Sequence, residues 1–119
     1  MRFQDLLVYK KSFVLGMEIY QITLKFPAEE KYSLTDQIRR SSRSVSVNIA
    51  EATRKRRYIK HFISKLTDSD AENAETQSWL EYSLACKYIN EEQFKNLTSL
   101  SLEVGKLINY MINNPDKFT

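Results

Sequence analysis

The stretch SLTDQIRRSSRSVSVNIAEATR, residues 33–54, decides the fold class. Its apolar residues recur at the spacing of one face of an α-helix, and they are Leu34, Ile38, Val45, Ile49 and Ala52. Ser33 to Asp36 resembles a capping box with Asp in place of Glu, so we predict a helix from Ser33 to about Arg54. The serines between the apolar positions are small enough to let a neighbouring helix approach closely.

Upstream, residues 5–26 carry another helical pattern, which predicts the first helix of the chain, so the helix of residues 33–54 is the second. We predict a helix that has Asp5 as its N-cap and ends at Phe26, because Pro27 disfavours helical backbone at the residue before it. The predicted core stripe is Leu6, Tyr9, Phe13, Met17, Tyr20 and Leu24, widened by Leu7, Val14 and Ile22.

Downstream, two more helices follow. The stretch 58–88 carries an apolar stripe of Ile59, Phe62, Ile63, Leu66, Leu80, Leu84 and Tyr88. Asn90 is the predicted N-cap of the last helix, Gln93 completes its capping box, and Pro115 follows its end. The apolar face of this helix is Phe94, Leu97, Leu100, Val104, Leu107, Ile108 and Met111. Four amphipathic helices with short connections predict one all-α domain over residues 1–119, an antiparallel up-down four-helix bundle.

The composition excludes several classes of site. The chain has 119 residues, a net charge of +3, and only one Cys, one His and two Gly. One Cys forms no intramolecular disulfide, one His with one Cys is too few for a structural zinc site, and two isolated glycines make no phosphate-binding loop. One His and one Cys also offer no nucleophile and base pair. We therefore expect no enzymatic activity and no cofactor.

No apolar run approaches the ~20 residues of a membrane span. The first 13 residues place charges within their apolar stretch and lack a small-residue cleavage site, so they do not resemble a secretory signal. We expect a protein of the cytoplasm with no membrane partner.

Charge is divided along the chain. Residues 34–65 carry nine basic and two acidic side chains, a net of +7, whereas residues 66–92 carry one and seven, a net of −6. On the predicted second helix, four arginines lie opposite the apolar face and continue into the following turn. The basic candidates for a nucleic-acid-binding site are Arg39, Arg40, Arg43, Arg54, Lys55, Arg56, Arg57 and Lys60.

Three interpretations of these basic residues are open. They form a solvated face whose last members complement the C-terminal dipole of the helix, or a surface that binds RNA or DNA phosphates, or a patch that meets the acidic run of another copy. In the acidic run, Asp68, Glu72 and Glu75 share a helix face. A bundle-core diiron site would need Glu-x-x-His pairs, which the sole His61 does not complete, so we expect no metal.

A polar interruption stands out on the third helix. Asp70, Asn73 and Gln77 occupy positions that periodicity assigns to the core, and an unpaired buried polar group costs about 1–3 kcal/mol. If helices two and three are antiparallel, Asp70 comes opposite Ser41 and Ser42. Two explanations are open: these residues form a polar layer between helices two and three or face another subunit, or the helix bends and exposes them.

Other chemically active side chains have ordinary explanations. We expect Cys86 to be a buried, inert thiol and His61 to be structural or surface-exposed. Tyr32 and Tyr58 lie among basic residues and are able to stack on bases, although packing at the core or rim is the simpler role.

Four segments of the chain form a distinctive set: Phe3-Gln4-Asp5-Leu6, Phe26-Pro27 with Tyr32-Ser33-Leu34-Thr35, Ser44 to Glu51, and Trp79-Leu80-Glu81. Together they resemble the bacterial four-helix-bundle proteins encoded in intervening sequences of 23S ribosomal RNA genes. The most specific segment is Asn48-Ile49-Ala50-Glu51. The family usually continues this segment with Gly, and Ala52 stands there instead, so we expect the helix to extend toward Arg54 to Arg57.

This resemblance implies an up-down bundle assembled as a homopentamer, with no settled biochemical activity. A related branch, the accessory proteins of diversity-generating retroelements, is associated with nucleic acid, which by analogy favours RNA or DNA binding. Two functions are therefore open. One is a non-enzymatic oligomer that binds RNA or DNA through its basic surface, and the other is a structural or adaptor assembly whose basic and acidic segments pair between subunits. For Asn48 and Glu51 we expect hydrogen bonds that fix the packing of the second helix on the third.

Overall fold

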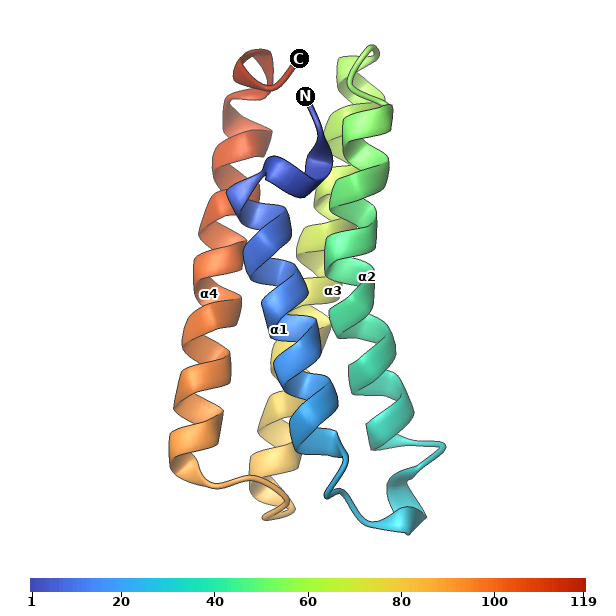
Figure 1. The fold of residues 1–119 in the computed structure, drawn as a ribbon, viewed down its shortest axis with the longest axis vertical. Helices are drawn as coiled ribbons and strands as arrows, with labels where there is room; N and C mark the ends of the chain where they lie inside the picture. The colour runs from blue at the N-terminus through green and yellow to red at the C-terminus, as the bar shows by residue number, and fades with distance from the viewer.

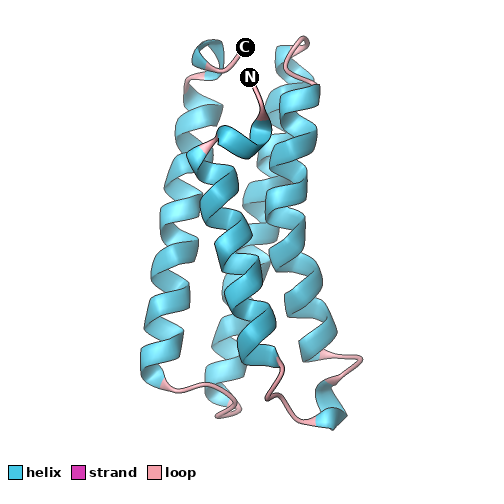
Figure 2. Ribbon diagram, viewed as in Figure 1, coloured by secondary structure: helices cyan, strands magenta, loops and turns pink.

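The computed structural model describes all residues 1–119 and contains four long helices: α1 (Leu7–Thr23), α2 (Leu34–Arg54), α3 (Ile59–Ala85) and α4 (Glu91–Asn113). Three short 3-10 turns accompany them: η1 (Phe3–Asp5), η2 (Ala28–Glu30) and η3 (Pro115–Lys117). The helices run alternately up and down in a bundle that measures 44 × 25 × 20 Å, and no strand is present (Figures 1 and 2). The predicted fold class is therefore confirmed.

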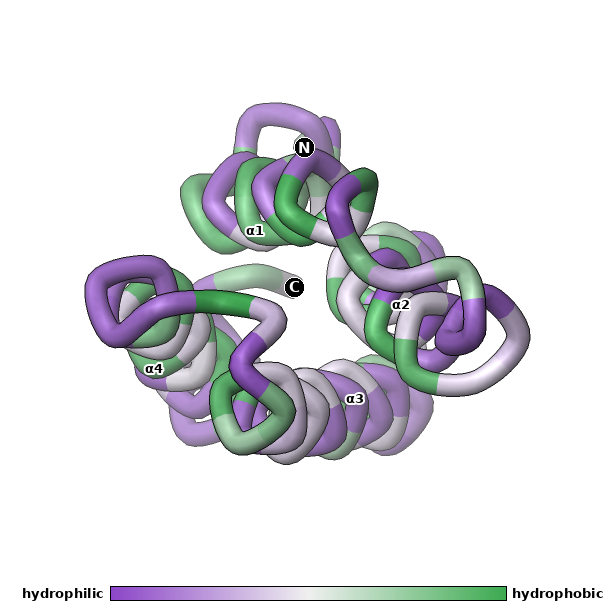
Figure 3. The backbone as a smooth tube through the Cα atoms, turned by 90° about the horizontal axis from the view of Figure 1, so that it is seen from below, coloured by the Kyte–Doolittle hydropathy of each residue, from purple (hydrophilic) through white to green (hydrophobic).

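Each helix lies side by side with two neighbours. α2 packs against α1 and α3, and α4 packs against the same two helices, as the view along the bundle shows (Figure 3). Both chain termini lie at the end of the bundle that holds the α2–α3 turn (Figure 1). The topology thus brings the first residues of the chain beside that turn.

Two apolar clusters fill the interior, one at each end of the bundle. The cluster near the α2–α3 turn is built around Val45, Ile49, Phe62, Val104 and Ile108, all without solvent exposure. The cluster at the opposite end is built around Leu15, Ile19, Ile38 and Leu80, which are equally buried, with Leu97. Buried polar residues on α2, α3 and α4 separate the clusters, and they include Ser41, Ser42, Ser69, Asn73, Thr76 and Ser101.

Of the two explanations for the polar residues of the third helix, a buried polar layer is present, but Asn73 and Gln77 face α4 and not, as expected, α2. Asn73 Nδ2 donates to the Ser101 carbonyl at 2.9 Å, and Gln77 Nε2 donates to the Ser101 hydroxyl at 2.9 Å, so both amides face α4. Toward α2, the hydroxyls of Ser41 and Thr76 lie 2.8 Å apart. These contacts satisfy groups that would otherwise be costly to bury.

The expected position of Asp70 is wrong. The α2–α3 register places Thr76, not Asp70, against Ser41, and Ser42 donates back to the Arg39 carbonyl of its own helix. Asp70 is half-buried and forms no side-chain hydrogen bond or ion pair. A shift of six residues along α3 separates the expected pairing from the observed one, because the turn after α2 holds four non-helical residues before α3 begins.

Helix starts follow the sequence signals at α4 and depart from them at α2. At α4 the predicted capping box is confirmed, with Gln93 N donating to Asn90 Oδ1 at 2.8 Å and Asn90 N donating to Gln93 Oε1 at 2.9 Å. At α2 the side chain of Ser33 caps no backbone N–H. It donates instead to Glu30 Oε1 at 2.6 Å, and the same oxygen accepts from Leu34 N at 3.3 Å. A carboxylate from η2 thus caps α2.

Helix α3 ends three residues earlier than predicted. Lys87 has a φ of 65°, Tyr88 N donates to the Ser83 carbonyl, and Lys87 N donates to the Leu84 carbonyl, both at 2.9 Å. This is a Schellman motif with lysine at the left-handed position that glycine usually occupies. The sequence pattern does not reveal the end of α3, because no glycine occupies the left-handed position.

The core face of α1 differs from the predicted stripe. Its buried residues are Val8, Ser12, Leu15, Ile19 and Thr23. Phe13, Met17 and Leu24 of the predicted stripe are 51%, 46% and 57% exposed. The helix is apolar on two sides, and its true core side contains two hydroxyl residues, so periodicity selected the wrong side. Asp5 lies in η1 rather than capping α1, and after Thr23 the chain tightens into 3-10 turns that reach Phe26.

Candidate nucleic-acid interface

The outer face of α2 carries the basic stripe that the sequence indicated. Arg40, Arg43 and Arg54 are exposed and Arg39 is half-buried, whereas Ile38 on the opposite face is fully buried. At 1.5 Å per residue, the stripe from Arg39 to Arg54 is about 22 Å long. This length corresponds to about six nucleotides of one stacked strand, at 3.4 Å each.

At the end of α2, cations gather around the turn to α3. α2 ends at Arg54, so the expected extension into Arg54 to Arg57 reaches only its first residue. Lys55, Arg56 and Arg57 form the turn, and Lys60 lies in the first turn of α3. The side chains of Arg54, Lys55, Arg57 and Lys60 make no ion pair and no hydrogen bond within the chain.

The N-terminal segment adds to this basic end. Arg56 Nη1 donates to the Met1 carbonyl at 3.1 Å. A cleft of about 360 Å³ lies between this segment and the end of α2, and its charged lining residues are Arg2, Arg54 and Arg56. Sequence reasoning missed Arg2, because its neighbours in space come from a part of the chain about 50 residues away. We call Arg2, Arg54, Lys55, Arg56, Arg57 and Lys60 the basic end.

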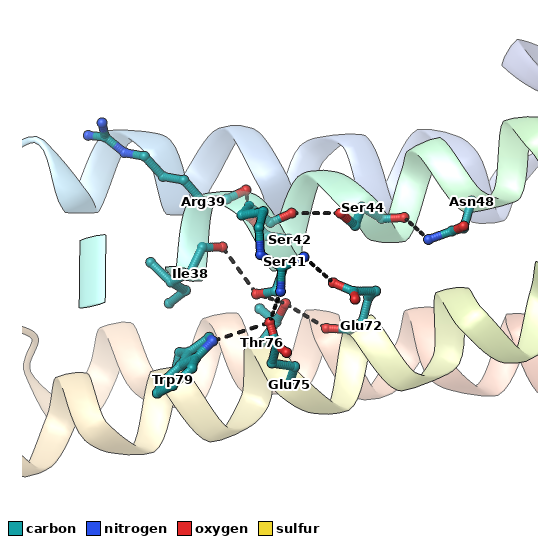
Figure 4. A network of polar contacts seen from close by, with 11 residues as sticks. Ile38, Arg39, Ser41, Ser42, Ser44, Asn48, Glu72, Glu75, Thr76 and Trp79 are labelled. Carbon is teal, nitrogen blue, oxygen red and sulfur yellow. Dashed lines mark hydrogen bonds and ion pairs between the residues drawn. The ribbon is translucent and has the colours of Figure 1, made fainter. Parts of the chain in front are cut away.

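Arg40 differs from the other arginines of the stripe. Its Nη2 lies 2.5 Å from Glu75 Oε2 and its Nη1 lies 3.5 Å from Glu72 Oε2, so it pairs with the acidic face of α3. Trp79 Nε1 donates to the same Glu75 oxygen at 3.4 Å. Figure 4 shows Glu72, Glu75 and Trp79 of α3 beside the Ser41–Thr76 contact. The charge of Arg40 is therefore largely neutralised within the chain.

Arg39 and Arg43 are held near an aromatic ring of α1. Arg39 Nε donates to Thr23 Oγ1 at 2.8 Å, and its guanidinium lies 4.9 Å from the centroid of the Tyr20 ring. The Arg43 guanidinium lies 5.9 Å from the same centroid and has no acidic partner. Cation–π contacts at this distance orient a guanidinium without neutralising it. Both arginines retain N–H donors for an external anion.

Glu51 and Asn48 take different roles. Glu51 Oε2 lies 2.6 Å from Lys65 Nζ on α3, and this bond raises the pKa of Lys65. The expected contact between Glu51 and the third helix is thus present. Asn48 Nδ2 donates to the Ser44 carbonyl of its own helix at 2.8 Å, so the same expectation for Asn48 is wrong (Figure 4).

The remaining reactive side chains lie apart from one another. His61 is exposed, with its ring centroid 5.9 Å from that of Tyr58. Cys86 is exposed at the C-cap of α3, which corrects the expectation of a buried thiol, because α3 ends before that residue reaches the core. No three His, Cys, Asp or Glu side chains are grouped so as to hold a metal ion. None of the helices has the length and apolar character that crossing a membrane requires.

Comparison with known proteins places the chain in a family. Residues 4–110 match the family model of the 23S rRNA-intervening sequence protein. The chain belongs to this family. The family resemblance found in the sequence, of which Asn48 to Glu51 is the most specific segment, is thereby confirmed.

A solved structure is similar to this chain in fold. It is the crystal structure of a protein of unknown function from the S23 ribosomal protein family of Bacteroides thetaiotaomicron. The two chains are 29% identical and superpose with a TM-score of 0.81, over 95% of this chain and 99% of that chain. No curated protein matches the sequence.

Proposed function

We propose that this 23S rRNA-intervening sequence protein is a non-enzymatic protein of the bacterial cytoplasm that binds RNA or DNA through its basic end and the α2 stripe. The observation that carries the proposal is the set of four cations at the basic end, Arg54, Lys55, Arg57 and Lys60, that have no partner within the chain. Cations held together without counter-charges repel one another, and an anionic ligand relieves that repulsion.

Nucleic-acid phosphates suit this surface. Arginine donors match phosphate oxygens in a bidentate geometry, and each neutralised phosphate releases condensed counterions. The α2 stripe continues from the basic end along the helix, with Arg43 about 16 Å from Arg54 at 1.5 Å per residue. A ligand with charges repeated along its length, such as a nucleic-acid backbone, engages both regions together.

The test is a salt titration of binding with a matched pair of variants. Labelled structured RNA and labelled DNA duplex are titrated with protein at low and near-physiological salt. In the first variant, Arg54, Arg57 and Lys60 are replaced by Gln. In the control, three exposed lysines elsewhere, Lys25, Lys95 and Lys106, are replaced by Gln, which removes the same charge.

The proposal expects binding that weakens steeply with salt, and weaker binding by the first variant than by the control. For duplex DNA the log–log salt slope changes by about 0.9 for each phosphate that the protein neutralises, so replacing three cations lowers the slope by up to about 2.7. Equal behaviour of the two variants, or no binding even at low salt, contradicts the proposal.

Self-association belongs to the same proposal. Phe13, Met17 and Leu24 expose apolar surface on the outer side of α1, whose inner side already packs in the core. A helix that is apolar all round is normally buried all round. We propose that this outer side contacts another copy in a homo-oligomer, a homopentamer by the family resemblance, so that several weak basic surfaces act together on one nucleic acid.

The alternative is a structural or adaptor assembly in which basic and acidic segments pair between subunits. In that case salt loosens the oligomer rather than releasing nucleic acid. The contacts within one chain favour the first function, because Arg40 already pairs with Glu72 and Glu75, and Lys65 lies 3.8 Å from Asp68. This leaves less acidic charge on α3 for the basic end of another copy.

A further inference from the structure

A groove on the outer side of α2 combines cations with an exposed aromatic ring. It has a volume of about 580 Å³, within the range of small-molecule sites. The lining residues that matter here are Lys31, Tyr32, Asp36, Arg39, Arg40 and Arg43. We call this the α2 groove. It begins before the N-terminus of α2 and extends along the helix to Val47, seven residues or about 10 Å from Arg54.

Two of the groove's arginines are available to an anion. The Arg43 side chain forms no ion pair and no hydrogen bond, and Arg39 uses only its Nε, on Thr23 Oγ1. Both lie over the Tyr20 ring, which holds their guanidinium groups on the same side of the bundle. Arg40 is occupied by Glu72 and Glu75. Arg39 and Arg43 are therefore the groove's cations with N–H donors free for an anion.

Tyr32 supplies a flat, unpacked surface next to these cations. Its side chain is 84% exposed, the greatest exposure among the chain's large hydrophobic residues. Lys31 Nζ lies 5.3 Å from the ring centroid, so one face carries a cation and the other is open. Because this aromatic ring is not packed against the rest of the chain, it is free to stack on a base.

We propose that the α2 groove binds an unpaired nucleotide of a single-stranded nucleic acid, with the base stacked on Tyr32 and the adjoining phosphate held by Arg39 and Arg43. This inference rests on the proposed function and names its substrate more closely. Stacking requires a base that has left its own helix, because bases inside a duplex present only their edges. The groove thus distinguishes single strands from duplexes, whereas the basic end contacts phosphates of either.

Asp36 limits where the phosphate lies. Its carboxylate is exposed in the groove near the N-terminus of α2 and has no ion-pair partner. Like charges repel, so the phosphate is placed toward Arg43, about two turns further along α2. The base is then left at the Tyr32 end. The strand runs from Tyr32 toward the basic end, and the two sites lie on one path along α2.

The test compares a single strand with a duplex on the full-length protein. The probes are a fluorescein-labelled RNA of about eight nucleotides without self-complementarity, and a blunt DNA duplex of about 16 base pairs, followed by anisotropy. The variants are Tyr32→Ala, Tyr32→Phe and Arg43→Gln. The control is Tyr82→Ala, which removes another exposed tyrosine, 57% exposed on α3.

Removal of one base–aromatic stack weakens binding about 5- to 150-fold. We expect Tyr32→Ala to lower affinity for the single strand by this much with an unchanged salt slope, because no charge is removed. Tyr32→Phe retains affinity, since the ring remains. Arg43→Gln weakens binding and lowers the salt slope by about 0.7, the single-strand value. None of the tyrosine variants alters duplex binding.

The inference is overturned if Tyr32→Ala binds the single strand as the unaltered protein does, or if Tyr82→Ala weakens it equally. Circular dichroism of each variant checks that the fold is retained. Failure of the groove is separable from failure of the proposed function. Duplex binding that depends on Arg54, Arg57 and Lys60 while Tyr32→Ala has no effect contradicts the groove alone. Absence of all binding contradicts both.

Discussion

The Ser101 hydroxyl of α4 donates a 2.8 Å hydrogen bond to Asn73 Oδ1 of α3, while Asn73 Nδ2 donates at 2.9 Å to the Ser101 carbonyl. Both residues are buried between the two apolar clusters. A reciprocal pair of this kind is satisfied in one register only, because sliding α4 by a turn leaves Asn73 without partners. The pair thus specifies how α3 and α4 align, while the apolar clusters supply most of the stabilisation.

Ser101→Ala is predicted to lower the free energy of unfolding by about 1–3 kcal/mol, because Asn73 Oδ1 and the Gln77 amide are each deprived of a partner. Urea denaturation measures the change. Ser99→Ala on the same helix is the control, since Ser99 is exposed and forms no side-chain hydrogen bond. Equal costs for the two variants contradict the role given to the hydroxyl.

Glu30 is predicted to make stability depend on acidic pH. Hydrogen bonds from the hydroxyls of Ser33 and Tyr88 and from Leu34 N hold its pKa below the usual 4.5. Because the folded pKa is lowered, the carboxylate stabilises the fold above about pH 4.5, and this contribution is lost as pH falls through the folded pKa. Glu30→Gln therefore lowers the melting temperature at pH 7, and the difference from the unaltered protein narrows below about pH 4.5. Glu29→Gln, at an exposed neighbour, serves as the control.

The same contact acts on Tyr88. The hydrogen bond from its hydroxyl to Glu30, with burial, raises the pKa of Tyr88 to about 12. The folded state therefore holds this proton after an unfolded tyrosine has released it near pH 10, so stability falls as pH rises from about 10 to 12. Tyr88→Phe is predicted to flatten that fall. Thermal melts between about pH 9 and 11 compare the two proteins, and an equally steep fall in the variant is the contrary result.

Lys87→Gly is predicted to stabilise the protein by up to about 1 kcal/mol. Lys87 has a φ of 65°, where a side chain is strained and glycine is not. Lys95→Gly, inside α4, is the matched substitution and is expected to destabilise by about 1 kcal/mol, because glycine is unfavourable within a helix. Urea denaturation measures the free energy of unfolding of both variants, and destabilisation by both contradicts strain at Lys87.

Self-association is predicted to depend on the outer side of α1. Replacement of Phe13, Met17 and Leu24 by Gln shifts the protein toward monomers in analytical ultracentrifugation, with little change in helicity, because these side chains lie outside the core. Val47→Gln is the control, since Val47 is a similarly exposed apolar residue on α2. A monomeric starting protein, or a triple variant that assembles unchanged, contradicts this prediction.

The extent to which the fold follows from the sequence varies from helix to helix. α2 and α4 have one apolar side each, so their cores and bounds are predictable, although only α4 has the cap that its sequence predicts. α1 is apolar on two sides, and its buried Ser12 and Thr23 hydroxyls bond to carbonyls of their own helix. Local bonding of this kind makes hydroxyl residues compatible with a core, and periodicity alone does not detect it.

For the candidate site, sequence identifies the cations but not their partners. Arg40 and Arg43 are equally basic in the sequence, yet only Arg40 meets acidic residues, because the α2–α3 register brings Glu75 to it. Arg2 joins the basic end through tertiary contacts alone. Whether a charge is free depends on which helices are neighbours, and no local pattern contains that information.

This difference between the two arginines leads to the last prediction. Arg43→Gln is predicted to weaken nucleic-acid binding more than Arg40→Gln, although each removes one positive charge from the same stripe. Arg40 is already paired with Glu75, so a phosphate must displace that carboxylate before it gains the guanidinium, whereas Arg43 has no such partner. Anisotropy titrations at several salt concentrations measure both affinity and slope.

The Arg40→Gln variant also leaves Glu72 and Glu75 uncompensated beside the groove, so a lower affinity in that variant comes from repulsion of the strand. Adding Glu75→Gln to Arg40→Gln relieves that repulsion and is expected to restore binding. If Arg40→Gln and Arg43→Gln have equal effects and Glu75→Gln restores nothing, the pairing within the chain does not control which arginines contact nucleic acid.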